Sequence, residues 1–186
     1  MLSLVTVARL HPNKGHFHAL EAIRRAREFG VDVTYAIAGE GPIREAVAAK
    51  IAELSLESAV ELLGTVSESE VMELLSKADG FLLTSVGKGE AWPVAVMEAM
   101  GAGLPVISSI IGATPEMITD GSDGFLVPQK DEEAIAKKII ELARDTKLRA
   151  RVGSAARITA QKRFDVEKSA GDLLRSISGN SRLILG

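Results

Sequence analysis

Short apolar runs rich in β-branched residues alternate along this chain with longer stretches that mix apolar and polar positions. The short runs are typical of strands, and six of them are expected, at residues 2–7, 31–38, 59–63, 80–84, 104–108 and 124–127. Several of these runs are apolar at every position, as in parallel strands that helices cover on both faces. The pattern therefore predicts an α/β fold with a doubly wound, parallel six-stranded sheet of the Rossmann-like type.

The longer stretches repeat apolar residues three or four positions apart, which is the spacing of an amphipathic helix. Two such stripes are formed by Phe17, Leu20, Ile23 and Ala26 and by Ile43, Val47, Ile51 and Leu54. Pro42 and Pro115 are each expected at a first helical position, and a capping box runs from Ser67 to Glu70. Three further helices are expected near the end of the chain, at about 131–144, 147–161 and 166–177.

Size and composition limit the classes of protein that fit. The 186 residues correspond to one domain, or to one large lobe of a bigger protein, which we expect at 1–178 with a disordered tail at 179–186. A net charge of −3 gives no basic field for nucleic acid, and without cysteine there is no disulfide or thiolate zinc site. No apolar run reaches the roughly 18 residues of a membrane span, and the start MLSLVTVARL lacks the layout of a signal peptide. A cytoplasmic protein is expected.

Candidate chemistry begins in the loop after the first strand, ARLHPNKGH. Ligands of doubly wound sheets bind beyond the carboxyl ends of the strands, where the strand order reverses, and this loop brings Arg9 and Lys14 there. A guanidinium binds a diphosphate in bidentate fashion, and an ammonium adds a point charge. The two cations are therefore candidates for a diphosphate site; the alternative is that both are solvated surface charges.

Glycines open the loops after the second and third strands. Gly39 and Gly41 would let a ligand approach the backbone, although glycine also simply makes turns. The sequence GEGPIR is not a dinucleotide fingerprint, because it lacks the third glycine. Gly64, Thr65 and Val66, which follow the third strand, are uninformative taken singly.

The loop after the fourth strand is the most informative, because it runs into an apolar helix that contains a carboxylate. Pro93 and Val94 are expected to begin that helix, whose free amide groups suit a phosphate. Glu98, one turn further on, has apolar flanks that leave little polar face, and carboxylates are rarely buried without partners. A ribose diol is one candidate partner, and Glu90 would then face the hydroxyls of a sugar. The alternative is that both carboxylates are solvated.

Taken together, six segments of the chain resemble the C-terminal, donor-binding domain of a retaining glycosyltransferase of the GT-B fold, in family four. They are VARLHPNKG, IAGEGP, LLGTV, GEAWPVAVMEAMGAGLPVISS, IGATPEMI and DGSDGFLVP, and the resemblance that rests on them covers nearly everything from Val7 to about Phe164. The resemblance implies that a hexosyl group is transferred from a UDP-, GDP- or ADP-sugar to an unknown acceptor. It also implies retention at the anomeric carbon and no metal or other cofactor.

The same resemblance implies roles for the residues that match the family's motifs. Arg9 and Lys14 would bind the diphosphate and, with Glu90 on the hydroxyls of the donor sugar, form the catalytic set. Glu98 would hold the ribose, and the base would lie near the second and third loops. The remaining donor-binding residues are Gly39, Gly41, Gly64, Thr65, Val66, Trp92, Pro93 and Val94, of which Trp92 has loop packing as its alternative role.

The chain also departs from the family pattern. The loop from Ser85 to Glu90 is a residue or two longer than the usual form, and Lys88 within it has no assignable role. Ala91 and Pro93 stand where glycine is common, which puts in doubt any backbone contact that needs a positive φ. The acceptor-binding lobe of the family is absent from the chain. We therefore expect this piece by itself to bind a nucleotide sugar weakly and to transfer nothing.

Other functions stay open at this stage. The chain could be a non-catalytic nucleotide-sugar-binding module, one subunit of a split transferase, or a lobe of a GT-B nucleotide-sugar epimerase. The expected partners are the nucleotide-sugar donor and an N-terminal acceptor-binding lobe, in the same chain or as a separate subunit. That lobe could hold the protein peripherally at a membrane. His11, His16 and His18 invite a metal hypothesis, but their spacing is not that of a metal site.

Overall fold

Six parallel strands form a single sheet, as the sequence predicts. The computed structural model describes residues 1–88 and 90–164, and its strands run in the order β3-β2-β1-β4-β5-β6. They are β1 (Leu2–Val7), β2 (Val33–Ala38), β3 (Val60–Gly64), β4 (Gly80–Leu83), β5 (Val106–Ser109) and β6 (Phe125–Val127). All neighbouring strands pair in parallel. The order reverses between β1 and β4, so the doubly wound topology is confirmed.

Two strands begin two residues later than the sequence pattern suggests, whereas the other boundaries agree within one residue. Val31 and Leu104 were expected in strands, but their amide groups donate back to the preceding helices, to the carbonyls of Ala26 at 3.2 Å and Ala99 at 3.0 Å. Their apolar side chains are buried. Each residue therefore closes the end of a helix, where an apolar contact commonly accompanies the capping hydrogen bond.

Helices connect the strands as expected, except that the helix start predicted at Pro42 is wrong. They are η1 (Pro12–Lys14), a 3₁₀ turn, and α1 (His16–Glu28), α2 (Arg44–Glu53), α3 (Glu68–Lys77), α4 (Val94–Gly101), α5 (Thr114–Met117), α6 (Glu132–Arg144) and α7 (Thr146–Arg163). Pro42 is not helical, because residues 41–44 form a turn closed by Arg44 N and Gly41 O at 3.2 Å. Pro115 is the second residue of α5, and the capping box at Ser67 is confirmed. The helix expected at 166–177 and the tail expected at 179–186 lie outside the described residues.

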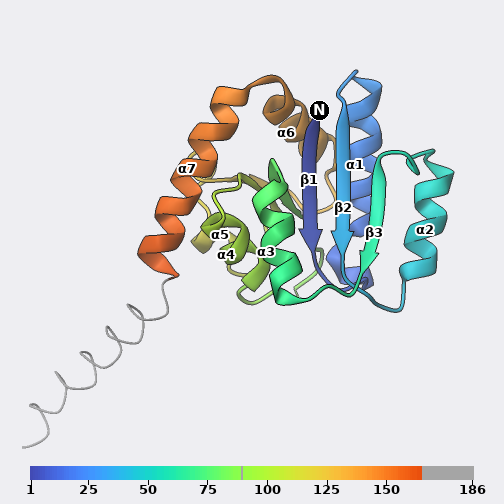
Figure 1. The fold of residues 1–186 in the computed structure, drawn as a ribbon, viewed down its shortest axis with the longest axis horizontal. Helices are drawn as coiled ribbons and strands as arrows, with labels where there is room; N and C mark the ends of the chain where they lie inside the picture. The colour runs from blue at the N-terminus through green and yellow to red at the C-terminus, as the bar shows by residue number, and fades with distance from the viewer. Residues whose placement is uncertain (89, 165–186) are drawn as a thin grey trace, which may run out of the picture.

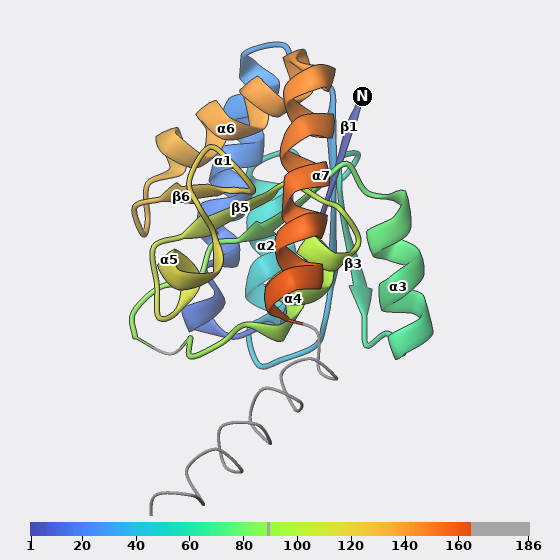
Figure 2. The same cartoon turned by 90° about the vertical axis from the view of Figure 1, so that its left-hand side faces the viewer.

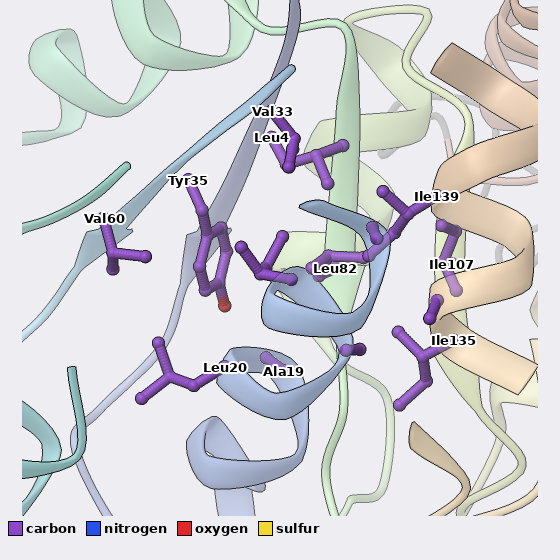
Figure 3. Close-up of a cluster of buried hydrophobic side chains, with 14 of the residues drawn as sticks. Leu4, Ala19, Leu20, Val33, Tyr35, Val60, Leu82, Ile107, Ile135 and Ile139 are labelled. Atoms are coloured by element: carbon purple, nitrogen blue, oxygen red, sulfur yellow. The ribbon is translucent and has the colours of Figure 1, made fainter. Parts of the chain in front are cut away.

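The sheet separates two apolar cores. On one face α1, α2 and α6 pack against alternate strand residues such as Leu4 and Tyr35, and Figure 3 shows these side chains meeting Leu20 of α1 and Ile139 of α6. On the other face α3, α4 and α7 pack against the intervening residues, such as Val5. Figures 1 and 2 show the resulting layers. No helix within the described part of the chain is long and apolar enough to cross a membrane.

Candidate active site at the carboxyl edge of the sheet

The loops after β1 and β4 lie against each other where the strand order reverses. Figure 1 shows the arrows of β1, β2 and β3 pointing toward this edge of the sheet. Val86 N donates to Asn13 O at 2.7 Å, and Thr84 Oγ1 donates to Gly15 O at 3.0 Å. Gly15 has φ of 67°, and a Cβ there would lie 1.8 Å from Thr84 O. Only glycine permits this approach, which brings the loops of Lys14 and Glu90 together.

Lys14 and Glu90, two of the predicted site residues, form an ion pair although they lie 76 positions apart in the sequence. The Glu90 side chain is only 8% exposed and that of Lys14 22%. Ser85 Oγ donates to the same carboxylate oxygen, Oε1, at 2.7 Å. Glu90 Oε2 has no partner among the described residues, and two of the three ammonium protons of Lys14 are not used by this pair. Glu90 Oε2 can thus accept a hydrogen bond from a hydroxyl group, and Lys14 can donate hydrogen bonds to an anion.

Ser85 is a site residue that the sequence analysis passed over. It is fully buried, and it orients Glu90 by fixing one of the two carboxylate oxygens. The available signal was its position, since a serine directly follows the apolar run FLLT at the end of a buried strand. Buried hydroxyls of this kind need a hydrogen-bond partner, and a carboxylate five positions away is a candidate.

Replacing Ser85 with alanine should lower the free energy of unfolding by about 1–2 kcal/mol, because a buried hydrogen bond to a charged acceptor is lost. The measurement is urea unfolding at pH 7. Ser76→Ala is the matched control, since Ser76 Oγ bonds only an exposed helix carbonyl, Glu73 O, and should change stability by less than about 0.5 kcal/mol. Equal effects of the two substitutions would show that Ser85 does not hold Glu90.

Arg9 lies beside a hollow at the same edge of the sheet. The hollow measures about 390 Å³ and is lined by Val7, Ala8, Arg9, Ala38, Gly39, Glu40, Thr65, Val66 and Val71. Four of the predicted donor-site residues, Arg9, Gly39, Thr65 and Val66, therefore meet here. Arg9 is exposed, and its guanidinium makes no hydrogen bond or ion pair with residues 1–88 and 90–164. The N–H groups of its guanidinium can therefore donate hydrogen bonds to an anion.

The predicted glycines at this edge have a packing role. A Cβ on Gly39 would lie 2.0 Å from Ala8 O, and one on Gly41 would lie 2.2 Å from Leu10 O. The loops after β1 and β2 are thus in direct backbone contact, which also includes Leu10 N donating to Glu40 O at 2.9 Å. Gly64 has φ of 74°, and its carbonyl accepts from Gly39 N at 2.7 Å. Close approach of neighbouring loops explains Gly39 and Gly41 without a ligand.

Glu98 lies one turn into α4, partly exposed, with no hydrogen-bond partner among the described residues. Burial raises the pKa of this carboxyl above its usual value, and the negative charge of Glu68, at the start of α3, raises it further. Glu68 follows the loop of Thr65 and Val66, so Glu98 faces the same side of the sheet edge as the hollow. A carboxylate that is partly desolvated and unpaired is suited to accept hydrogen bonds from hydroxyl groups.

Glu98→Gln should raise the thermal midpoint at pH 7. The folded state holds the Glu98 proton more tightly than the unfolded chain does, so the ionised carboxylate lowers stability as the pH rises. The gain should shrink as the pH falls through the raised pKa toward 4.5, the ordinary pKa of the group, and should be nearly gone below it, because Glu98 is then neutral in both states. Thermal unfolding from pH 4 to pH 8 measures this. Glu57→Gln, on an exposed carboxylate, is the control, and an equal gain from it would contradict the prediction.

The start of α4 is as predicted, and Trp92, just before it, contacts the end of α7. The helix begins at Val94 with Pro93 before it, and no side chain caps its free amide groups. Neither Ala91 nor Pro93 has a positive φ. The Trp92 ring meets the Phe164 ring edge to face, with 6.1 Å between centroids. Trp92 therefore packs the loop against the end of α7, which was the alternative role expected for it.

The three histidines point to separate partners. His11 Nδ1 contacts Asn13 Oδ1 at 2.6 Å, and His18 Nδ1 contacts Glu132 Oε1 at 2.6 Å. His16 is buried, its pKa is lowered chiefly by that burial, and its neutral ring donates from Nε2 to Arg9 O at 2.9 Å. No group of three potential metal ligands occurs among the described residues. His16 instead braces the loop that carries Arg9 and Lys14.

The parallel sheet with helices on both faces, together with the residues gathered at its carboxyl edge, defines one lobe of a GT-B glycosyltransferase. The chain belongs to the family described as glycosyl transferases group 1, whose pattern matches residues 2–159.

Relatives of known name support the same assignment. The chain is 39% identical over 147 residues to the putative colanic acid biosynthesis glycosyltransferase WcaL of Salmonella typhimurium, a match that covers 77% of this chain and 36% of that protein. It is 36% identical over 184 residues to WcaL of Escherichia coli, covering 95% of this chain and 45% of the relative. The chain therefore spans less than half the length of these relatives.

A solved structure of similar fold is that of the Anabaena protein HepE in complex with UDP-glucose. It superposes with a TM-score of 0.84 at 25% sequence identity, covering 96% of this chain and 49% of HepE. The six-stranded sheet and its flanking helices are therefore also found in about half of HepE.

Proposed function

We propose that this chain is the donor-binding lobe of a retaining, family-four glycosyltransferase that transfers a hexosyl group from a nucleoside diphosphate sugar. The observation that carries the proposal is the convergence of Lys14, Glu90 and Ser85 at the edge of the sheet where Arg9 lines a hollow. Cations for a diphosphate and a carboxylate for sugar hydroxyls thus lie at one edge of the sheet. The structural neighbour HepE, described as a complex with UDP-glucose, supports a nucleotide sugar as the ligand.

Each of these residues binds the part of the nucleotide sugar that suits its chemistry. The Arg9 guanidinium donates hydrogen bonds to the diphosphate. Lys14 donates to it from the two ammonium N–H groups that do not bond Glu90. Glu90 Oε2 accepts from a hydroxyl of the sugar, Glu98 accepts from the ribose, and the base lies in the hollow near Thr65. The free amides at the start of α4 add a positive end for the phosphates.

The chemical step breaks the bond between the anomeric carbon and the phosphate oxygen and forms one between that carbon and a nucleophilic atom of the acceptor, so a nucleoside diphosphate leaves with growing negative charge. Arg9 and Lys14 stabilise that leaving group electrostatically. Glu90 holds the sugar and is not assigned as a nucleophile. The acceptor and the residues that bind it belong to a second lobe, so this chain alone binds the donor weakly and transfers nothing. We place the protein in the cytoplasm, where nucleotide sugars would be the substrates, and assign no metal.

The test is calorimetry against UDP, GDP and ADP and their hexose conjugates, with the wild-type chain and with Arg9→Ala and Glu98→Ala. One nucleotide series should bind, and each substitution should weaken it by about tenfold, which corresponds to the loss of about 1.4 kcal/mol. Hydrolysis or epimerisation of a donor without acceptor would indicate the epimerase alternative. Binding that is unchanged in both variants would show that the donor site lies elsewhere.

A further inference from the structure

The loop between β4 and α4, which carries Glu90, is held by a side chain from a distant part of the sequence. Gln129 lies two residues beyond the end of β6 and 42 positions after Gly87. Its Oε1 accepts from Gly87 N at 2.7 Å, and its Nε2 donates to Gly87 O at 3.2 Å and to Ile110 O at 3.0 Å. The Gln129 amide thus both accepts from and donates to the main chain of Gly87, as a neighbouring strand would. It also bonds the loop after β5, at Ile110 O.

This set of hydrogen bonds needs the chemistry of a carboxamide. Gln129 uses one acceptor and two donors, all on one planar group, and the three bonds determine which end is oxygen and which is nitrogen. A glutamate at the same place would accept from Gly87 N but would set its second oxygen against the carbonyls of Gly87 and Ile110. An alanine would make none of the three contacts.

Gln129 holds Gly87 through its main chain, next to Val86, whose N donates to Asn13 O at 2.7 Å. Gly87 is exposed, and an added Cβ there would meet no atom within 4 Å, so packing does not restrain it. On the far side of Glu90 the loop is in direct contact with its neighbour, because Ala113 N donates to Ala91 O at 3.1 Å. The loop is therefore anchored both before and after Glu90, and the anchor at Gly87 depends on a single side chain.

We propose that Gln129 is a positioning residue for recognition of the donor sugar. It makes no contact with the donor. It fixes Gly87, in a loop that is longer than the usual form in the family, and so helps to keep Glu90 in contact with Ser85 and Lys14. This inference rests on the proposed function, because it assigns the role of Glu90 to the sugar. The nucleotide and its diphosphate are bound by other elements, so loss of Gln129 should affect the sugar and spare the nucleotide.

The experiment compares UDP and UDP-glucose as probes, by calorimetry, in the wild type, Gln129→Glu and Gln129→Ala. Gln161→Ala, on an exposed α7 residue with no described partner, is the control. We expect the Kd of UDP to change less than twofold in the Gln129 variants. The ratio of the UDP-glucose Kd to the UDP Kd should rise about fivefold, as expected from weakening one hydrogen bond. An unchanged ratio, or an equal loss for both probes, would overturn the proposal.

Amide hydrogen exchange without ligand gives a second readout. Exchange in residues 85–91 should accelerate in Gln129→Glu and stay unchanged in the control, while exchange in the strands is the same in both. Unaltered exchange at this loop would also overturn the proposal. If the loop loosens as expected but the wild type binds neither these probes nor the GDP and ADP series, the Gln129 anchor is real and the proposed donor site is wrong, so the two failures are distinguishable.

Discussion

Replacing Arg9 with alanine should reduce the rate of sugar transfer by about a hundredfold to a thousandfold, the usual cost of removing a donor aimed at developing negative charge. The same change should leave the stability of this lobe within about 0.5 kcal/mol of the wild type. Arg9 is exposed, and its side chain has no partner among the described residues, so the folded state loses nothing with it. Initial rates in a protein that joins this lobe to its acceptor-binding lobe, and urea unfolding of this chain, measure the two effects.

Two other variants separate leaving-group stabilisation from general electrostatics. Arg44→Ala, which removes a cation at the start of α2 paired with Glu40 at 3.0 Å, should lower the rate less than threefold. Lys14→Ala should lower both the rate and the stability, since it leaves the buried carboxylate of Glu90 without its counter-charge. If Arg9→Ala transfers sugar at the wild-type rate, the diphosphate is not bound where we propose.

Gly112→Ala should be the most destabilising single-methyl change at the candidate site. Gly112 has φ of 51°, and a Cβ there would lie 1.5 Å from Glu90 O. We expect a loss of about 3 kcal/mol, from about 1 kcal/mol of backbone strain and about 2 kcal/mol of overpacking. For a chain of this size that corresponds to a thermal midpoint lower by about 6–12 °C. Because the clash is with the backbone of Glu90, binding of the nucleotide sugar should also be lost.

Gly121→Ala is the matched control for this effect. Gly121 also has a positive φ, 72°, but an added Cβ meets nothing within 4 Å. It isolates the backbone strain, and we expect a decrease in the thermal midpoint of only about 2–4 °C with unchanged ligand binding. Equal decreases in the two variants would mean that the loops after β4 and β5 are not in contact at Glu90.

The fold was predictable from the sequence to a large extent, because the signals for strands and helices are local. Six runs of apolar residues correspond to the six strands, and the alternation of strand and helix leads to a parallel sheet. The errors fell at boundaries. Val31 and Leu104 are apolar and precede strands, yet they close helices, and hydrophobicity alone does not distinguish the two roles. Pro42 precedes its helix because the turn at Gly41 comes first.

The site was predictable as a set of loops but not as a set of contacts. The rule that ligands bind at the carboxyl edge selected the loops of Arg9, Lys14, Glu90 and Glu98. It did not reveal that Lys14 and Glu90 are partners, because that contact depends on how closely two loops approach. Ser85 was missed for the same reason.

The sequence by itself determined which segments become strands and helices and which loops share an edge, since residue periodicity and turn residues act over a few positions. The tertiary structure decided which side chains meet across those loops. The Lys14–Glu90 pair joins residues 76 positions apart, and the hydrogen bonds of Gln129 join it to residues 42 and 19 positions away. Such contacts form only where backbones approach within hydrogen-bond distance, and sheet register and the glycines between loops set that approach.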